Sequence, residues 1–172
     1  MLIRLATPQD IKSILSIVRS AQLSLKELGI DQWQDGYPTA EIIERDIESN
    51  AGYVYVEDNM VVGYAAIVLT GEIAYKQIDD HVWGTGEDYV VVHRLCVGKD
   101  FTRKGIAISL MRKAKELAIE AGYSGFRIDT HRGNVRMLSM MDRLGFEYRG
   151  IIHYDSGERL AYDLKFENST ML

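Results

Sequence analysis

The stretch from Val90 to Leu110, VVVHRLCVGKDFTRKGIAISL, decides the fold of this chain. Its first part is rich in valine and largely apolar, which predicts a strand over Tyr89–Val97. A polar turn follows, and a Gly-x-Ala step then opens a segment with apolar residues at helical spacing, which predicts a helix over Gly105–Ala121. A helix that begins there presents unpaired backbone N–H groups and the positive end of its dipole. With Arg103 and Lys104 beside it, this helix start predicts a cradle for a phosphate group.

The cradle does not match the two common nucleotide-binding motifs. No Gly-Lys-Ser or Gly-Lys-Thr step follows an earlier glycine at the spacing of a P-loop, and the pattern G-x-G-x-x-G is absent. A Gly-x-Ala step is also compatible with a helix that simply starts at this point and binds nothing. The local pattern leaves this alternative open.

The segments on either side predict a mixed α/β (α+β) fold with one mixed sheet. Further strands are expected at residues 2–5, 53–56, 60–70, 126–130, 146–154 and 159–166, and further helices after Thr7, after Thr39 and from Asn134. The resulting order, β-α-α-β-β-β-α-β-α-β-β, favours helices on both faces of the sheet. No repeat or linker interrupts the 172 residues, so a single domain over residues 1–172 is expected.

Composition narrows the class of protein. Hydrophobic residues make up 47% of the chain and charged residues 26%, as in an ordinary folded globular protein. The longest apolar run, Met60–Leu69, is too short to cross a bilayer, and the N-terminus lacks the pattern of a secretion signal. A cytoplasmic protein is therefore expected.

Titratable residues argue against metal and nucleic-acid sites. Cys96 is the single cysteine and the four histidines form no metal-binding pair, so no metal is expected. A sequence pI near 5.4 is far below that of a nucleic-acid-binding domain. The first 90 residues hold 6 Lys and Arg against 15 Asp and Glu, whereas residues 91–172 hold 14 against 10. The second part would suit an anionic partner and the first a cationic one, or both are ordinary solvated surface.

Four motifs, taken in order, resemble the GNAT superfamily of acyl-CoA-dependent N-acetyltransferases over nearly the whole chain. They are a first strand followed by Thr7-Pro8-Gln9-Asp10, the segment Val61–Ala65 after a hairpin, Leu95–Val97 with Phe101–Ala107, and Asn134 with Leu144-Gly145-Phe146. Each motif is common alone, but the ordered set is specific. The resemblance implies a single GNAT-like domain with a splayed central pair of strands, the fourth and the fifth.

The resemblance also implies that acetyl-CoA is the co-substrate and where it binds. Pantetheine would lie between the splayed strands, bonded to the backbone of Leu95 and Val97, and the pyrophosphate would sit on the backbone amides from Arg103 to Ile108. The cofactor-binding candidates are Leu95, Cys96, Val97, Thr102, Arg103, Lys104, Gly105, Ile106, Ala107, Ile108, Asn134 and Arg143. Thr102 stands where the family pattern has Gln or Arg, so it keeps a hydroxyl donor but lacks a long side chain.

His93 is the catalytic candidate. An amine must lose a proton before it attacks a thioester, and an imidazole can accept that proton at neutral pH. His93 precedes Leu95 by two residues, so the two are expected to share a strand face beside the thioester. A similar His-x-Leu-x-Val arrangement occurs in arylalkylamine acetyltransferases, and the Leu95 N–H would stabilise the oxyanion. A hydrogen-bonded structural histidine is the alternative.

Met141 stands where many family members carry a tyrosine that acts as general acid. A thioether cannot donate a proton. The leaving thiol resembles that of cysteine, with a pKa of roughly 8.5, so it departs tolerably as thiolate near neutral pH. Slower turnover is therefore expected, rather than none.

Large aromatic residues in the acidic part of the chain resemble the family's acceptor-binding wall. The substrate-binding candidates are Trp33, Tyr37, Tyr75 and Trp83. An aromatic wall beside carboxylates suits a cationic amine. The alternative is that these rings only pack over the core.

Together these features predict an N-acetyltransferase that moves an acetyl group from acetyl-CoA directly to a primary amine of a small molecule or peptide. Cys96 alternates with Leu95 along the strand, which disfavours a covalent acyl-enzyme and favours a ternary complex. An acyl-CoA-binding module or sensor with little or no turnover is the alternative, favoured by Met141. A protein-interaction domain is a third reading, favoured by Thr102. Neither nucleic acid nor membrane is expected as a partner, and a homodimer stays open.

Overall fold

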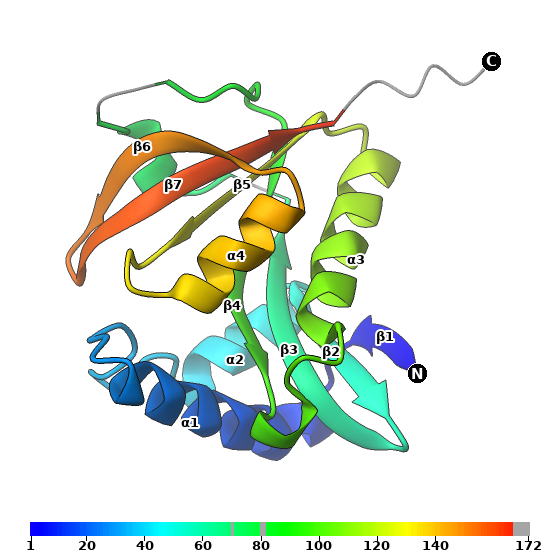
Figure 1. Cartoon of the computed structure of the whole chain (residues 1–172). Helices are drawn as coiled ribbons and strands as arrows, with labels where there is room; N and C mark the ends of the chain where they lie inside the picture. The colour runs from blue at the N-terminus through cyan, green and yellow to red at the C-terminus, as the bar shows by residue number, and fades with distance from the viewer. Residues whose placement is uncertain (70, 80–81, 167–172) are drawn as a thin grey trace. The chain divides into compact units, whose positions relative to one another are not determined.

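The computed structural model describes residues 1–69, 71–79 and 82–166. In this part of the chain the strands and α-helices follow the predicted order (Figure 1). The strands are β1 (Leu2–Leu5), β2 (Gly52–Glu57), β3 (Met60–Val68), β4 (Tyr89–Val97), β5 (Gly125–Thr130), β6 (Glu147–Tyr154) and β7 (Gly157–Lys165). The helices are α1 (Ile11–Glu27), α2 (Ala40–Glu48), α3 (Ile106–Glu120) and α4 (Val135–Arg143), with short 3-10 turns η1 (Pro8–Asp10), η2 (Ile73–Lys76) and η3 (Lys99–Phe101). The strand order is β1-β2-β3-β4-β5-β7-β6 with parallel and antiparallel pairs, so the predicted mixed fold is confirmed.

Most element bounds differ from the sequence prediction by one or two residues, and the segment that follows β3 differs in two ways. β3 ends at Val68, whereas a strand was expected as far as residue 70, and Thr70 lies outside the described residues. The segment 71–86, in which the sequence predicts no helix or strand, contains η2. Glu72 starts this turn because its side chain accepts a hydrogen bond from the Ala74 N–H (3.3 Å).

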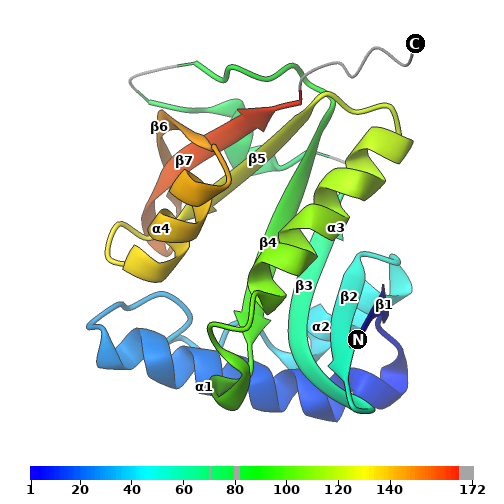
Figure 2. The same cartoon turned by 45° about the vertical axis from the view of Figure 1, so that its right-hand side comes forward.

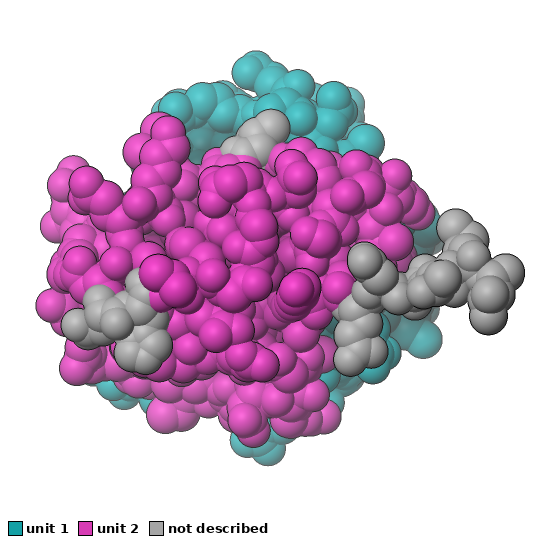
Figure 3. Space-filling model, turned by 90° about the horizontal axis from the view of Figure 1, so that it is seen from above, with its two compact units in different colours: residues 1–67, 92–113 teal, residues 68–91, 114–172 magenta. Residues whose placement is uncertain are grey.

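The chain forms two compact units whose segments alternate along the sequence (Figure 3). Unit 1 comprises residues 1–67 and 92–113, and unit 2 comprises residues 68–91 and 114–172. β3, β4 and α3 therefore each begin in one unit and end in the other. The single domain expected over residues 1–172 stays a prediction.

In unit 1, α1 and α2 pack on one face of β2 and β3 (Figure 2). Buried residues of these helices and strands form one cluster with Ala6, which follows β1, and Cys96 of β4; the cluster is Ala6, Ile14, Ile17, Val18, Ile43, Val54, Tyr64 and Cys96. On the opposite face the first turns of α3 approach β3 closely, because a Cβ added at Gly63 would lie 2.7 Å from the Ile106 side chain. Glycine at this position permits the close packing of helix on strand.

Unit 1 begins with an ion pair between β1 and η1. Arg4 donates to Asp10 through Nη1 (2.7 Å) and Nη2 (2.9 Å), and Asp10 also accepts from the Thr7 N–H (2.8 Å) and hydroxyl (2.9 Å). The Arg4 bonds, helped by those from Thr7 and opposed by burial, lower the pKa of Asp10 to about 2. The Thr-Pro-x-Asp signature thus forms the start of the first helix, as predicted.

In unit 2, β7 lies between β5 and β6 and is antiparallel to both. The first residues of β4 pair with β5 in parallel, Tyr89–Val91 with Gly125–Arg127. Figure 1 shows α4 in front of β5 and β7. A second core cluster contains Tyr75, Tyr89, Val91, Ile152 and Ala161.

The splay expected between β4 and β5 beyond Val91 stays a prediction, because the second half of β4 belongs to unit 1 and β5 to unit 2. Among the described residues, no helix combines the length and the apolar character that crossing a membrane requires.

Candidate active site

The turn between β4 and α3 forms a cradle of backbone N–H groups in unit 1. Arg103 and Gly105 have positive φ angles of 65° and 79°, so the chain turns sharply on both sides of Lys104. The hydrogen-bond ladder of α3 begins with the Ser109 N–H, which donates to the Gly105 carbonyl (2.9 Å). The N–H groups of residues 106–108 therefore have no partner within the helix. A Cβ added at Gly105 would meet nothing within 4 Å, so the space beside the helix start is open.

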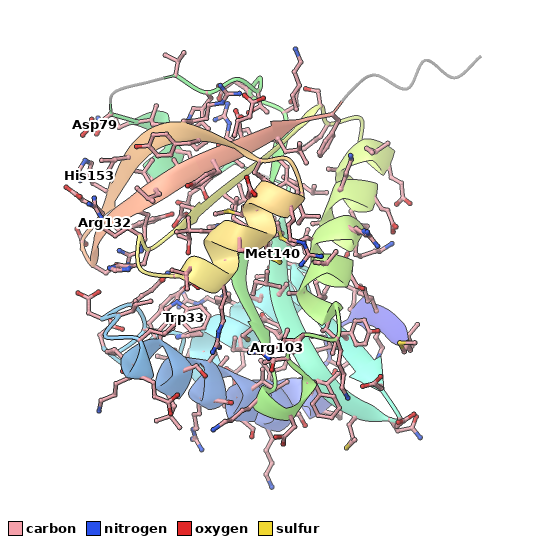
Figure 4. The ribbon with its side chains drawn as sticks, viewed as in Figure 1. Trp33, Asp79, Arg103, Arg132, Met140 and His153 are labelled. Carbon is pink, nitrogen blue, oxygen red and sulfur yellow. The ribbon has the colours of Figure 1, made fainter. Side chains whose placement is uncertain are left out.

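Exposed cations stand at the cradle. Arg103, labelled in Figure 4, extends from the turn, and its side chain is exposed. Lys104 Nζ lies 3.9 Å from Glu57 Oε2 and 4.7 Å from the centroid of the Phe101 ring. The Thr102 hydroxyl donates to the Lys99 carbonyl (3.1 Å), so it closes the turn. The capacity to hold an anion thus resides in the backbone amides and in Arg103.

The second half of β4 carries the strand residues predicted to contact pantetheine. Cys96 is 5% exposed and its side chain lies in the core cluster of unit 1, while Leu95 and Val97 are half-buried. Burial raises the pKa of the Cys96 thiol to about 12, although nearby Arg94 opposes the shift. Cys96 is thus a buried strand residue, and its thiol stays protonated at neutral pH.

Arg94 interrupts the regular alternation of β4. Its φ angle is 55°, in the left-handed region. The argument that places His93 on the face of Leu95 requires a continuous extended strand, and it does not carry across this residue. His93 is half-buried on β4, and its catalytic role stays a prediction.

The loop after α1 brings Trp33 and Tyr37 together in unit 1. Their ring centroids lie 6.3 Å apart, and both residues are half-buried. Gln22 Nε2 donates to the Tyr37 carbonyl (2.8 Å), and Arg94 Nη1 donates to the Tyr37 hydroxyl (2.7 Å). Trp33, labelled in Figure 4, also packs against the core cluster. The two rings thus serve packing with one part of their surface and face solvent with another.

Tyr75 and Trp83 lie together in unit 2, so the structure brings the four aromatic candidates together as two pairs, one in each unit. Their ring centroids are 5.1 Å apart, and Trp83 Nε1 donates to the Tyr75 carbonyl (2.8 Å). Tyr75 is 2% exposed, and its hydroxyl donates to Asp129 (2.8 Å), which also accepts from the Tyr154 hydroxyl (3.1 Å). Burial, then the Asp129 charge, raises the pKa of Tyr75. Tyr75 is a core residue, as the packing alternative predicted, whereas Trp83 is half-buried.

Both ends of α4 carry cofactor-binding candidates of unit 2. Asn134 opens the helix as predicted, since its side-chain oxygen accepts from the Met137 N–H (3.3 Å). A cofactor contact would therefore fall to the amide nitrogen of Asn134. Arg143 is exposed in the last turn. Met141 is fully buried, so its thioether packs in the protein interior.

The sequence profile of the acetyltransferase (GNAT) family matches residues 18–146, which is most of the chain and includes β4, the cradle and α4. The chain belongs to the GNAT acetyltransferase family. The resemblance found in the ordered motifs is thereby confirmed. No curated protein matches the chain.

Solved structures of other acetyltransferases share the fold of this GNAT acetyltransferase. A GNAT-family acetyltransferase from Streptococcus agalactiae 2603 is 32% identical, with a TM-score of 0.83 over 97% of this chain and 96% of that chain. A putative acetyltransferase from Staphylococcus aureus Mu50 is 24% identical, with a TM-score of 0.74 over 97% of this chain and 100% of that chain. PaiA N-acetyltransferase from Thermoplasma acidophilum, in complex with coenzyme A, is 19% identical, with a TM-score of 0.70 over 96% of this chain and 98% of that chain.

Sequence reasoning missed one polar pair in this GNAT acetyltransferase, Arg94 and Asp46. A signal was present for each. Arg94 interrupts an apolar strand, and a charge buried there must find a partner. Asp46 follows Ile43 by three residues on an amphipathic helix, so it shares the buried face. What the sequence does not specify is that these two residues pair with each other.

Proposed function

We propose that this protein is an N-acetyltransferase that transfers the acetyl group of acetyl-CoA to a primary amine of a small molecule or peptide. The observation that carries the proposal is the open cradle at the start of α3, with Gly105 at a φ of 79°, in a chain of the GNAT acetyltransferase family. The fold relative PaiA from Thermoplasma acidophilum, in complex with coenzyme A, supports the same class of ligand.

The cradle residues fit a pyrophosphate. The N–H groups of residues 106–108 provide donors at the positive end of a helix, and the missing side chain of Gly105 lets an anion approach the backbone. Arg103 adds an exposed cation, and Thr102 acts by closing the turn. Two further assignments are carried over from the family resemblance. Pantetheine is assigned to the backbone of Leu95–Val97, and Asn134 and Arg143 are assigned as further contacts.

Acetyl-CoA supplies the acetyl thioester, and the residues of this chain handle the proton and the charge. The Leu95 N–H donates to the carbonyl oxygen as it gains negative charge. His93 accepts the proton of the amine, directly or through a water, while the nitrogen–carbon bond forms and the carbon–sulfur bond breaks. Met141 offers no proton, so the thiol leaves as thiolate. Because Cys96 is buried and its pKa is raised to about 12, its thiol is a poor nucleophile, which supports direct transfer in a ternary complex over an acyl-enzyme at this residue.

The acceptor is proposed to meet aromatic side chains. Trp33 and Tyr37 of unit 1 are half-buried and so expose part of their rings. Trp83 of unit 2 is a candidate carried over from the family resemblance; it is half-buried, packs on Tyr75, and has the Arg127 guanidinium 4.6 Å from its ring centroid. The face of an aromatic ring attracts a cation. A primary amine that arrives as an ammonium ion is therefore the favoured acceptor class.

A screen of amines with acetyl-CoA tests the proposal. Polyamines, amino acids, aminoglycosides and short peptides are each incubated with the protein and acetyl-CoA, free thiol is measured, and the acetylated product is identified by its mass. Amine-dependent thiol release is expected. Binding of acetyl-CoA without release would identify an acyl-CoA-binding module or sensor, the alternative favoured by the thioether at Met141. Absence of binding would overturn the proposal.

A further inference from the structure

Arg94 is the centre of a polar network in unit 1 to which the proposed reaction gives no task. Its guanidinium holds Asp46 by two bonds, from Nε to Oδ2 (2.8 Å) and from Nη2 to Oδ1 (2.6 Å), and donates from Nη1 to the Tyr37 hydroxyl (2.7 Å). Asp46 also accepts from the Tyr64 hydroxyl (2.6 Å). The side chains of Arg94 and Asp46 are 11% and 10% exposed, and Tyr64 is 0% exposed, so these three members of the network are shielded from water, whereas Tyr37 is half-buried.

The network joins three segments that are distant in sequence. Arg94 is on β4, Asp46 is in the last turn of α2, and Tyr37 is in the loop between α1 and α2, which we call the acceptor loop (residues 31–38). This loop also carries Trp33. Arg94 immediately precedes Leu95, the residue whose N–H is proposed to stabilise the oxyanion. One side chain therefore contacts the proposed acceptor wall while its own backbone adjoins the proposed oxyanion donor.

The backbone of Arg94 needs this anchoring. A φ of 55° is unfavourable for a residue with a side chain, and such a conformation persists only when its surroundings hold it. Hydrogen bonds between a guanidinium and a carboxylate are among the strongest hydrogen bonds in proteins. Burial alone would lower the pKa of Arg94, but Tyr37 and Asp46 outweigh it and raise the pKa, so the side chain stays charged. The turn at Arg94 sets the direction of the Leu95 amide that follows.

We propose that Arg94 is a positioning residue that fixes the acceptor loop and the Leu95 amide in one arrangement. It acts on the loop through Tyr37 and on Leu95 through its own backbone, with Asp46 as the fixed anchor. The proposal rests on the proposed function, because it takes the roles of the loop and of the Leu95 amide from there. A lysine cannot replace Arg94, since a single ammonium lacks the fork that holds both partners.

Two variants separate the effect of Arg94 on the acceptor loop from its effect on the Leu95 amide, and a third variant is their control. Tyr37→Phe removes the hydroxyl on the acceptor loop. Arg94→Lys weakens the hydrogen bonds both to Tyr37 and to Asp46, and so affects both the loop and the Leu95 amide. Tyr55→Phe makes the same chemical change on β2 of unit 1, where the hydroxyl contacts the Met1 sulfur (2.9 Å). For Tyr37→Phe we expect the KM for the amine to rise roughly fivefold to fiftyfold, with kcat and the KM for acetyl-CoA nearly unchanged. For Arg94→Lys we expect kcat also to fall, roughly tenfold to a hundredfold. Tyr55→Phe keeps parental constants.

Amide hydrogen exchange supplies a readout that does not depend on turnover. Exchange in residues 31–38 should be faster in both variants, and exchange in residues 92–97 should be faster in Arg94→Lys alone. Parental exchange and parental KM values in Arg94→Lys overturn the proposal, and so does faster exchange spread evenly over the chain, which marks a merely structural role. If Arg94→Lys does not fold, the proposal is judged on Tyr37→Phe. Parental exchange in residues 31–38 and a parental KM for the amine in that variant overturn it. If the parent protein transfers no acetyl group, the proposed function fails, and the segment-specific exchange alone decides this inference.

Discussion

The N–H of Ser109 donates to the carbonyl of Gly105 at 2.9 Å, and this bond opens the ladder of α3. The amides of residues 106–108 therefore emerge from the helix beside the open space at Gly105. A phosphate group placed there would satisfy donors that have no partner within the helix. Position 105 is consequently where charge should govern cofactor binding most directly.

Gly105→Asp and Gly105→Asn test the cradle as a matched pair. The two side chains are equal in size, and both tolerate the left-handed backbone better than other residues do. Backbone strain is thus common to both, whereas only aspartate brings negative charge toward the phosphates. We expect acetyl-CoA to bind Gly105→Asp at least about tenfold more weakly than Gly105→Asn, a difference of about 1.4 kcal/mol, measured by titration calorimetry. Equal affinities would place the phosphate site elsewhere.

Cys96→Ala tests the direct route of transfer. Because burial raises the pKa of Cys96 to about 12, the thiol should react slowly with iodoacetamide at pH 8 in the folded protein and rapidly in urea. Cys96→Ala should lose about 1 kcal/mol of unfolding free energy and keep turnover near that of the parent. A mass increase of one acetyl group on the parent protein, incubated with acetyl-CoA but no amine and absent in Cys96→Ala, would show an acyl-enzyme and contradict the ternary complex.

Asp10→Asn tests the ion pair at the start of the first helix. The pKa of Asp10 is lowered to about 2 in the folded protein, so its stabilising effect is present above the unfolded value near 4 and is lost as pH falls toward 2. Since Arg4 is 37% exposed, solvent reduces the effect. We expect Asp10→Asn to lower the unfolding free energy by about 1–2 kcal/mol at pH 7 and by little near pH 2. Asp58→Asn, on the exposed turn after β2, is the control, and an equal loss at both pH values would refute the pairing.

Element order was predictable because it follows from apolar periodicity, which burial imposes over many residues. Ile14 and Val18 of α1 and Ile43 of α2 are buried at the positions that helical spacing indicates. Cys96 is likewise buried, as a small apolar side chain inside a strand should be. In these cases the local pattern and the packing of the whole chain favour the same structure.

The site was predictable only in part. The backbone angle of a single residue, and a polar pair formed by residues distant in sequence, produce no periodic pattern in the sequence. Strict alternation of side chains along β4 predicted that His93 shares a strand face with Leu95. The left-handed φ of Arg94, between the two residues, removes the basis of that prediction. Thr102 is a cofactor-binding candidate that keeps a hydroxyl donor, and the sequence gives no sign that this hydroxyl donates to the Lys99 carbonyl. Tyr75 has a pattern that fits both an acceptor wall and a core, and only packing decides that it is buried.

His93→Gln tests the proposed base. Glutamine is close to an imidazole in size and also forms hydrogen bonds, but it cannot accept a proton at neutral pH. We expect turnover at limiting amine and pH 7 to fall roughly tenfold to a thousandfold. The KM for acetyl-CoA should stay near the parental value, because its proposed contacts are to backbone and phosphate. The measurement is kcat/KM for the amine between pH 6 and pH 10.

The pH dependence separates a base from a merely structural histidine. Amines lose their proton near pH 10, so at high pH the solvent delivers neutral amine and the defect of His93→Gln should shrink. A structural role predicts instead a loss that is constant with pH and accompanied by lower unfolding free energy, which denaturant unfolding measures. His93→Ala repeats the test with a side chain that forms no hydrogen bonds, unlike the amide of glutamine. A folded His93→Gln protein with parental turnover at pH 7 would rule out the assignment, and the proton would then have to leave through ordered water and backbone carbonyls.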